Sequence, residues 1–151
     1  MGNIFNKDFQ DFIQSLNDAN VEYVLLGGYA TIIHGYNRTT GDLDIWVNKT
    51  KSNYKRIILA FNQFKMSVFD MTEDKFLNDL SIDVFSFGRP PVSIDIMTQV
   101  KGLKFEEVYN NAEDRLIDNN LIVKVIHFND LIKAKKATNR PKDQDDIEHL
   151  T

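Results

Sequence analysis

The fold of this chain is decided by residues 21–48, which read VEYVLLGGYATIIHGYNRTTGDLDIWVN. The apolar run 23–26 is rich in Val, Leu and Tyr and predicts a buried strand. Gly27 and Gly28 interrupt this run, and a short apolar segment follows them. A second strand is predicted to begin at Asp42, so two strands with a glycine pair between them form the centre of the expected fold.

The second predicted strand carries two carboxylates on one face. Because side chains alternate along a strand, Asp42, Asp44 and Trp46 share a face. The opposite face is apolar and consists of Leu43, Ile45 and Val47. Two carboxylates about 5 Å apart repel by roughly 3 kcal/mol at an effective dielectric constant near 20. A bound cation relieves this repulsion, and an oxygen site with few protein ligands suits Mg²⁺.

Composition restricts the class of protein. The 151 residues fit a single domain, 1–151, and the apolar fraction of 42% with eleven Phe suffices for a sizeable core. The absence of Cys excludes disulfides and thiolate chemistry and favours a cytoplasmic location. No signal peptide and no membrane span is expected, because the first residues, MGNIFNKDF, lack a basic region followed by an apolar one and no apolar run approaches 18 residues. The net charge of −4 argues against a basic nucleic-acid surface over the whole molecule but leaves a local patch open.

Hydrophobic periodicity places further elements on both sides of this centre, and the class expected is α/β (α+β). Amphipathic or capped helices are predicted at 6–18, 29–35, 52–64, 72–77, 104–112 and 143–150. A helix before the last one is expected to be capped by Asn129 or Asp130 and to end at Arg140-Pro141. Strands 81–87 and 92–97, joined by a turn at 88–91, are expected to form an antiparallel hairpin, and residues 115–128 to be β-rich with a turn at Asn119-Asn120.

A third acid belongs to the strand 92–97. Alternation puts Ser93, Asp95 and Met97 opposite the apolar residues of that strand. Asp95 can therefore face the same side of the sheet as Asp42 and Asp44. Asp83, in the sequence IDVF, is the rival for this third position, because it has the same local pattern one strand earlier.

The order of these motifs resembles the nucleotidyltransferase superfamily whose best-known member is DNA polymerase beta, and within it the small bacterial proteins related to AbiEii-type toxins. An Asp-x-Asp motif alone also occurs in glycosyltransferases and phosphatases, so the resemblance depends on the ordered set. The matching residues are Gly27-Gly28, His34-Gly35, Arg38-Thr39, Asp42-Leu43-Asp44, Ser93-Ile94-Asp95-Ile96, Asp130-Leu131-Ile132, Lys135, Arg140-Pro141-Lys142-Asp143 and Asp146-Ile147. It implies a nucleotidyltransferase-like mixed sheet flanked by helices, with a C-terminal helical segment.

The resemblance also implies roles for individual residues. Asp42 and Asp44 would bind Mg²⁺, with Mn²⁺ as the alternative, and Asp95 would complete a three-carboxylate catalytic and metal site. Asp95 would also help to orient or deprotonate the acceptor hydroxyl. The residues expected to bind the nucleotide are Gly27, Gly28, Tyr29, Arg38 and Lys135. Many family members have Ser or Thr where this chain has Tyr29, which weakens the expectation of turnover.

Several neighbouring residues have simpler interpretations. His34 is expected to be a packed or capping histidine rather than an acid–base group. Trp46 is expected to pack on the sheet, with flanking a nucleotide base as the alternative. Arg38 is a solvated loop residue, or pairs with a metal-site carboxylate or a phosphate. Lys133 and Lys135 have, as the alternative to phosphate binding, a solvated helix face. A salt-bridged structural end without a catalytic role is expected of Arg140, Lys142, Asp143 and Asp146.

The function expected from this reading is the transfer of a nucleoside monophosphate from an NTP to an acceptor with release of pyrophosphate. The acceptor class stays open among a tRNA or other RNA, a protein side chain and a small hydroxylated compound. Three other classes compete: a toxin–antitoxin component with a cognate antitoxin or other partner chain, a non-catalytic nucleotide-binding module, and a structural interaction domain. The last gives no reason for three acids on one face.

Overall fold

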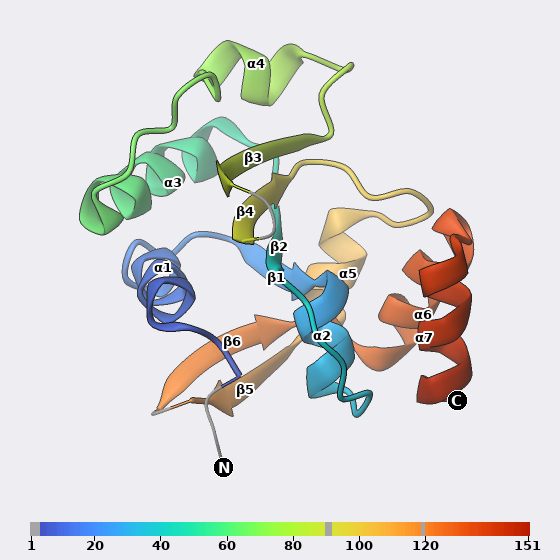
Figure 1. Cartoon of the computed structure of the whole chain (residues 1–151). Helices are drawn as coiled ribbons and strands as arrows, with labels where there is room; N and C mark the ends of the chain where they lie inside the picture. The colour runs from blue at the N-terminus through green and yellow to red at the C-terminus, as the bar shows by residue number, and fades with distance from the viewer. Residues whose placement is uncertain (1–3, 90–91, 119) are drawn as a thin grey trace.

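The computed structural model describes residues 4–89, 92–118 and 120–151, and within these ranges the chain forms a six-stranded sheet with seven helices (Figure 1). The strands are β1 (Tyr23–Leu26), β2 (Asp42–Val47), β3 (Val84–Arg89), β4 (Val92–Met97), β5 (Glu113–Ile117) and β6 (Leu121–Val125). The helices are α1 (Lys7–Asp18), α2 (Gly27–Ile33), α3 (Lys51–Phe64), α4 (Glu73–Asn78), α5 (Phe105–Asn111), α6 (Phe128–Thr138) and α7 (Pro141–Leu150). The α/β class predicted from the sequence is confirmed.

The sheet is mixed, with the strand order β3-β4-β2-β1-β6-β5. β2 lies antiparallel to β1 and parallel to β4, so segments distant in sequence become neighbours at the centre. β1 and β6 are parallel, whereas the outer pairs β3–β4 and β5–β6 are antiparallel. The predicted hairpin pairing of β3 and β4 is thus confirmed. β3 spans Val84–Arg89 rather than the expected 81–87, so Gly88 and Arg89 of the predicted turn belong to the strand, and Pro90-Pro91 lie outside the described residues.

Helices α1 and α3 pack together on one side of the sheet, while α5, α6 and α7 lie on the other (Figure 1). The rings of Phe12 and Phe61 meet edge to face with a centroid distance of 5.5 Å, an arrangement that aromatic pairs favour. Leu43 and Ile45 of β2 are fully buried in the core. Asp42 and Asp44 therefore lie on the opposite face of β2, the side of the sheet on which α5, α6 and α7 are found.

Three further predicted boundaries are wrong. The helix expected at 29–35 begins at Gly27, so the glycine pair forms its first turn. The β-rich segment expected at 115–128 ends at Val125, because α6 starts at Phe128. The N-cap of α6 is His127 rather than the expected Asn129 or Asp130. A ring nitrogen of His127 accepts a hydrogen bond from the Asn129 backbone. Of the predicted Asn119-Asn120 turn, Asn119 lies outside the described residues.

Candidate active site

Two neighbouring strands bring the three predicted acids onto one face. In the parallel pairing of β2 with β4, Asp44 lies directly opposite Asp95, and Asp42 lies opposite Ser93. The Ser93 hydroxyl is 2.9 Å from a carboxylate oxygen of Asp42 and 3.3 Å from one of Asp95, so it donates to one or the other. The catalytic roles of these acids stay a prediction, but their shared face is a property of the register.

Asp44 has a strongly raised pKa. Burial, followed by the negative charges of Asp95 and Asp42, raises the pKa of Asp44 to about 7, and the charge of Lys142 acts weakly in the opposite direction. A carboxyl group with this pKa is protonated in roughly half of the molecules at neutral pH. A hydrogen bond with the Asp95 side chain also favours the protonated form.

The glycine pair makes room for side chains that lie over it. Gly27 has a φ of +72°, and a Cβ atom there would overlap the Asp44 carboxyl group. A Cβ atom at Gly28 would overlap the Thr40 hydroxyl. The first glycine is therefore required twice, once by its left-handed backbone and once by the closeness of Asp44.

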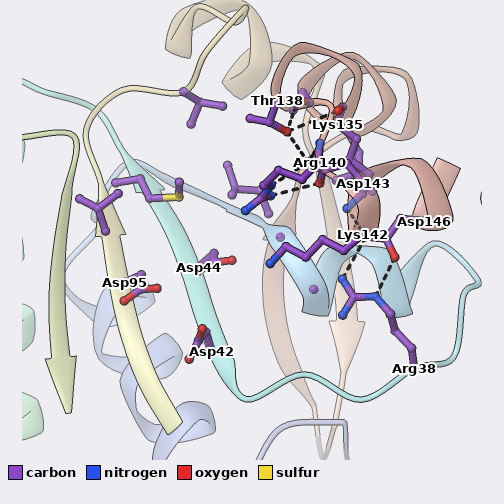
Figure 2. Close-up of a pocket in the computed structure, with 18 residues that line it drawn as sticks. Arg38, Asp42, Asp44, Asp95, Lys135, Thr138, Arg140, Lys142, Asp143 and Asp146 are labelled. Carbon is purple, nitrogen blue, oxygen red and sulfur yellow. Dashed lines mark hydrogen bonds and ion pairs between the residues drawn. The ribbon is translucent and has the colours of Figure 1, made fainter. Parts of the chain in front are cut away.

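The acids form one wall of a pocket of about 320 Å³ (Figure 2). Helices α6 and α7 form the opposite wall together with Arg38 of the loop before β2, and this wall contains four cationic side chains. The lining residues on which the site depends are Gly27, Gly28, Arg38, Asp42, Asp44, Asp95, Lys135, Arg140, Lys142 and Asp146. The pocket thus has carboxylates on the sheet side, and on the helix side four cations together with two acids of α7, Asp143 and Asp146.

Asp146 of α7 joins two of these cations in a buried network. Lys135 Nζ lies 2.8 Å from Asp146 Oδ2, and the two side chains are 7% and 2% exposed. The Arg38 guanidinium binds the same carboxylate through two nitrogens, at 2.8 and 3.0 Å. Arg38 is therefore neither a solvated loop residue nor the partner of Asp42, Asp44 or Asp95, because its ion pair is with Asp146. The Lys135 ammonium, which was predicted to be free for phosphate, forms an ion pair with the same carboxylate.

A second network fixes the start of α7. The Asp143 carboxylate accepts hydrogen bonds from the Arg140 backbone at 3.0 Å, the Arg140 guanidinium at 2.7 Å and the Thr138 hydroxyl at 2.7 Å. Burial alone would raise the pKa of Asp143, but these hydrogen bonds outweigh it and lower the pKa to about 2. The predicted salt-bridged end is present for Arg140 and Asp143, whereas Asp146 pairs with Arg38 and Lys135 instead.

Four other candidates lie away from the pocket. Tyr29, predicted to touch the nucleotide, is 6% exposed and packs against Phe5 and Phe9, with ring centroids 4.9 and 5.8 Å away. Burial and, next, the charge of Asp42 raise the pKa of its hydroxyl. Asp83, the rival third acid, precedes β3, is exposed and is not a lining residue, so Asp95 holds that position.

His34 and Trp46 pack as expected. A ring nitrogen of His34 lies 2.7 Å from the Ile126 carbonyl oxygen. Trp46 is 2% exposed and meets Phe105 edge to face at 5.3 Å. Neither side chain is part of the pocket lining.

Lys142 is the pocket residue whose position the sequence did not reveal. Its side chain is exposed and extends from the first turn of α7 into the pocket, on the side of Asp44 (Figure 2). The run Arg140-Pro141-Lys142-Asp143 suggested a salt-bridged end. In the structure Arg140 forms an ion pair with Asp143, whereas Lys142 extends into the pocket, and this difference depends on how α7 is oriented. Proline before Lys142 was the available signal, because it marks the start of a helix and hence a side chain at its first turn.

The acids fit a divalent cation by their chemistry. The donor set consists of carboxylate oxygens, and Asp44 and Asp95 face one another across neighbouring strands. Residues 4–89, 92–118 and 120–151 contain no group of three or more His, Cys, Asp or Glu side chains placed to hold a metal ion. Mg²⁺ commonly uses one or two carboxylates and takes its other ligands from phosphates and water, so the facing pair suffices.

Comparisons with known proteins agree with this geometry. Over residues 6–151 the chain matches a family described as "Nucleotidyltransferase of unknown function (DUF6036)". The crystal structure of an antigenic nucleotidyltransferase-like protein from Paracoccidioides brasiliensis superposes with a TM-score of 0.55 at 16% identity, covering 93% of this chain and 71% of that one. No curated protein matches the chain. The likeness confirms the predicted nucleotidyltransferase-like fold.

Proposed function

The chain belongs to the family of nucleotidyltransferases of unknown function (DUF6036), and from this premise we propose that it is a Mg²⁺-dependent enzyme that transfers a nucleoside monophosphate from an NTP to a hydroxyl acceptor. A further part of the proposal is a kinship with AbiEii-type toxins, which motivates the search for a partner chain described below. The structure describes no helix that is both long and apolar enough to cross a membrane.

One observation carries the proposal: a single pocket has carboxylates on one wall and cations on the other. A metal-bound triphosphate has the complementary arrangement, because its cation faces the acids and its phosphates face the basic side chains. The pocket volume of about 320 Å³ lies at the lower end of the range found for small-molecule sites. A purely structural interaction surface would not need two half-buried carboxyl groups opposite one another.

Asp44 and Asp95 would hold the metal, with Asp42 beside them. Bound Mg²⁺ would neutralise phosphate charge and activate the α-phosphorus for in-line displacement. Ser93 keeps the Asp42 carboxylate in place through its hydroxyl, at 2.9 Å. The raised pKa of Asp44 fits this assignment. It means that the protein does not fully compensate the negative charge of this carboxyl group, which a bound cation would do.

Asp95 is the proposed general base. Its carboxylate accepts the proton of the acceptor hydroxyl, whose oxygen forms a bond to the α-phosphorus. The bond between the α-phosphorus and the oxygen bridging to the β-phosphorus breaks, and pyrophosphate leaves with that electron pair. Cations on the helix wall stabilise the charge that develops on the leaving group.

Transfer of a labelled nucleotide tests the proposal. The protein is incubated with Mg²⁺, each of the four NTPs labelled at the α-phosphate, and total cell extract, and the label is located among RNA, protein and small molecules. We expect one labelled acceptor class, EDTA-sensitive labelling and no labelling by folded Asp44→Asn or Asp95→Asn. A protein that binds NTP without labelling anything is the non-catalytic module, and labelling abolished by one co-purifying chain identifies an antitoxin.

A further inference from the structure

We propose that Lys142 binds the triphosphate of the incoming nucleotide, and that it, rather than Lys135, supplies the free positive charge of the pocket. The inference rests on the proposed function, because it assigns a binding residue to the NTP of that reaction. This assignment differs from the one expected from the sequence, which gave phosphate binding to Lys135 and placed Lys142 in a structural end.

Most cations of the pocket are already paired with acids. Among the described residues, four cationic side chains line the pocket, and three of them bind carboxylates of α7. Arg38 and Lys135 share Asp146, whose side chain is 2% exposed, and Arg140 binds Asp143. If Lys135 moved to a ligand, the buried Asp146 carboxylate would lose one of its two cationic partners, which is costly in free energy. The positive charge of Lys135 is therefore poorly available to a ligand.

Lys142 differs from these three in both exposure and pairing. Within the part of the chain that the structure describes, no acid forms an ion pair with Lys142, and the side chain is exposed. It nevertheless lines the same pocket as Asp44 and Asp95 and extends toward them (Figure 2). An ammonium group in this position can reach an anion bound between the two walls without breaking an existing ion pair.

The base of the Lys142 side chain is held firmly, although its end is free. Pro141 occupies the first position of α7, and the Asp143 carboxylate closes the helix start by accepting hydrogen bonds from Arg140 and Thr138. The backbone of Lys142 therefore has a fixed place at the pocket rim. A fixed backbone that carries an unpaired ammonium group suits a ligand whose phosphates arrive together with a cation.

The ligand that fits is a polyphosphate rather than a monophosphate. A magnesium–NTP complex keeps net negative charge after its metal has met the acids, and the β- and γ-phosphates carry most of it. Lys142 faces this excess charge from the helix wall. A nucleoside monophosphate places no phosphate beyond the one at the metal, so it should depend little on Lys142.

Calorimetric titration of the full chain tests the inference. The probes are the magnesium complexes of ATP, GTP, CTP, UTP and tripolyphosphate, and the monophosphate of the best-bound nucleotide. The variants are Lys142→Ala and Lys142→Gln, with Lys142→Arg as the charge-conserving form. Lys136→Ala is the matched control, because Lys136 is an exposed lysine of α6 outside the pocket and its loss changes the net charge equally.

We expect Lys142→Ala and Lys142→Gln to weaken binding of the best NTP and of tripolyphosphate by about 10- to 100-fold, as for other hydrogen bonds to charged groups. Monophosphate affinity should stay within about twofold, Lys142→Arg should retain most of the NTP affinity, and Lys136→Ala should behave as wild type. Wild-type NTP affinity in both neutral variants, or an equal loss in Lys136→Ala, overturns the inference alone. A wild-type protein that binds no magnesium–NTP overturns the proposed function and the inference with it.

Discussion

The Asp44 carboxyl group occupies space that the backbone leaves open because Gly27 has no Cβ atom. Burial and two neighbouring acids then make its charged form costly. Alternation along β2 predicted the face of Asp44, and the same alternation in β4 predicted that of Asp95. The closeness of the two side chains could not be predicted, because it depends on which strands pair and in which register.

Asp44 should make the stability of the apo protein fall with rising pH. Its pKa is about 7 in the folded protein against an ordinary value of 3.8, so the folded state binds the extra proton between these values. The stabilising contribution is complete below pH 4 and is lost as the pH rises through about 7, by roughly 4 kcal/mol in total.

Urea denaturation of wild type and Asp44→Asn at pH 4.5, 6, 7 and 8, with EDTA, isolates this effect. As the pH rises, the unfolding free energy of the wild type should fall relative to that of Asp44→Asn, because the variant lacks the titrating carboxyl group. Asp143 contributes with the opposite sign in both proteins, because its pKa of about 2 gives stability that is lost on acidification. A difference independent of pH would show that Asp44 is not perturbed.

At the scale of elements, α7 connects the tail of the chain to the loop that leads into β2. Arg38 lies in that loop, and its only described partner carboxylate is Asp146 of α7. Tyr36, in the same loop, donates a hydrogen bond to Asp145 and stacks on His149 at a centroid distance of 4.1 Å. Helical periodicity predicted α7 itself but no partner for Asp146, because Arg38 is 108 residues away.

Breaking this connection should destabilise the protein strongly. Asp146→Asn leaves the buried Lys135 ammonium, 7% exposed, without its carboxylate and also removes the charge that holds Arg38. The expected loss in unfolding free energy is about 3 to 5 kcal/mol. Asp145→Asn is the control, since its partners are exposed, and should cost less than about 1 kcal/mol.

Chemical denaturation at pH 7 measures both variants. Replacing the pair together, as Lys135→Met with Asp146→Leu, should recover part of the loss, because neither charge is then buried alone. A cost for Asp146→Asn no greater than that of Asp145→Asn would mean that the network does not hold α7 in place.

At the scale of the whole molecule, the pocket exists because the sheet and the tail meet. The acids come from β2 and β4, the glycines from the start of α2, and the cations from α6, α7 and the loop before β2. Each of these segments was recognisable from the sequence, and so was the α/β class. The pairing of Lys135 and the freedom of Lys142 were not, since both follow from how α7 lies against the remainder of the fold.

Ligand binding across this pocket should stabilise the entire fold. If the protein binds a magnesium–NTP complex only when folded, a ligand concentration 100-fold above Kd adds about 2.7 kcal/mol to the unfolding free energy. For a chain of this size, that corresponds to a rise in Tm of about 5 to 10 °C. EDTA should remove most of the rise, because the metal links the acids of the sheet to the phosphates.

Thermal denaturation of wild type and Asp44→Asn, each with NTP and either Mg²⁺ or EDTA, checks this expectation. Asp44→Asn should have a Tm at pH 8 that is equal to or above that of the apo wild type, because it removes a like-charge repulsion. The same variant should gain little from magnesium and NTP, since one of the two proposed metal ligands is missing. Higher apo stability with lost ligand stabilisation separates a binding carboxylate from a structural one: a structural Asp44 would lower the apo Tm when replaced and leave the ligand-induced rise intact.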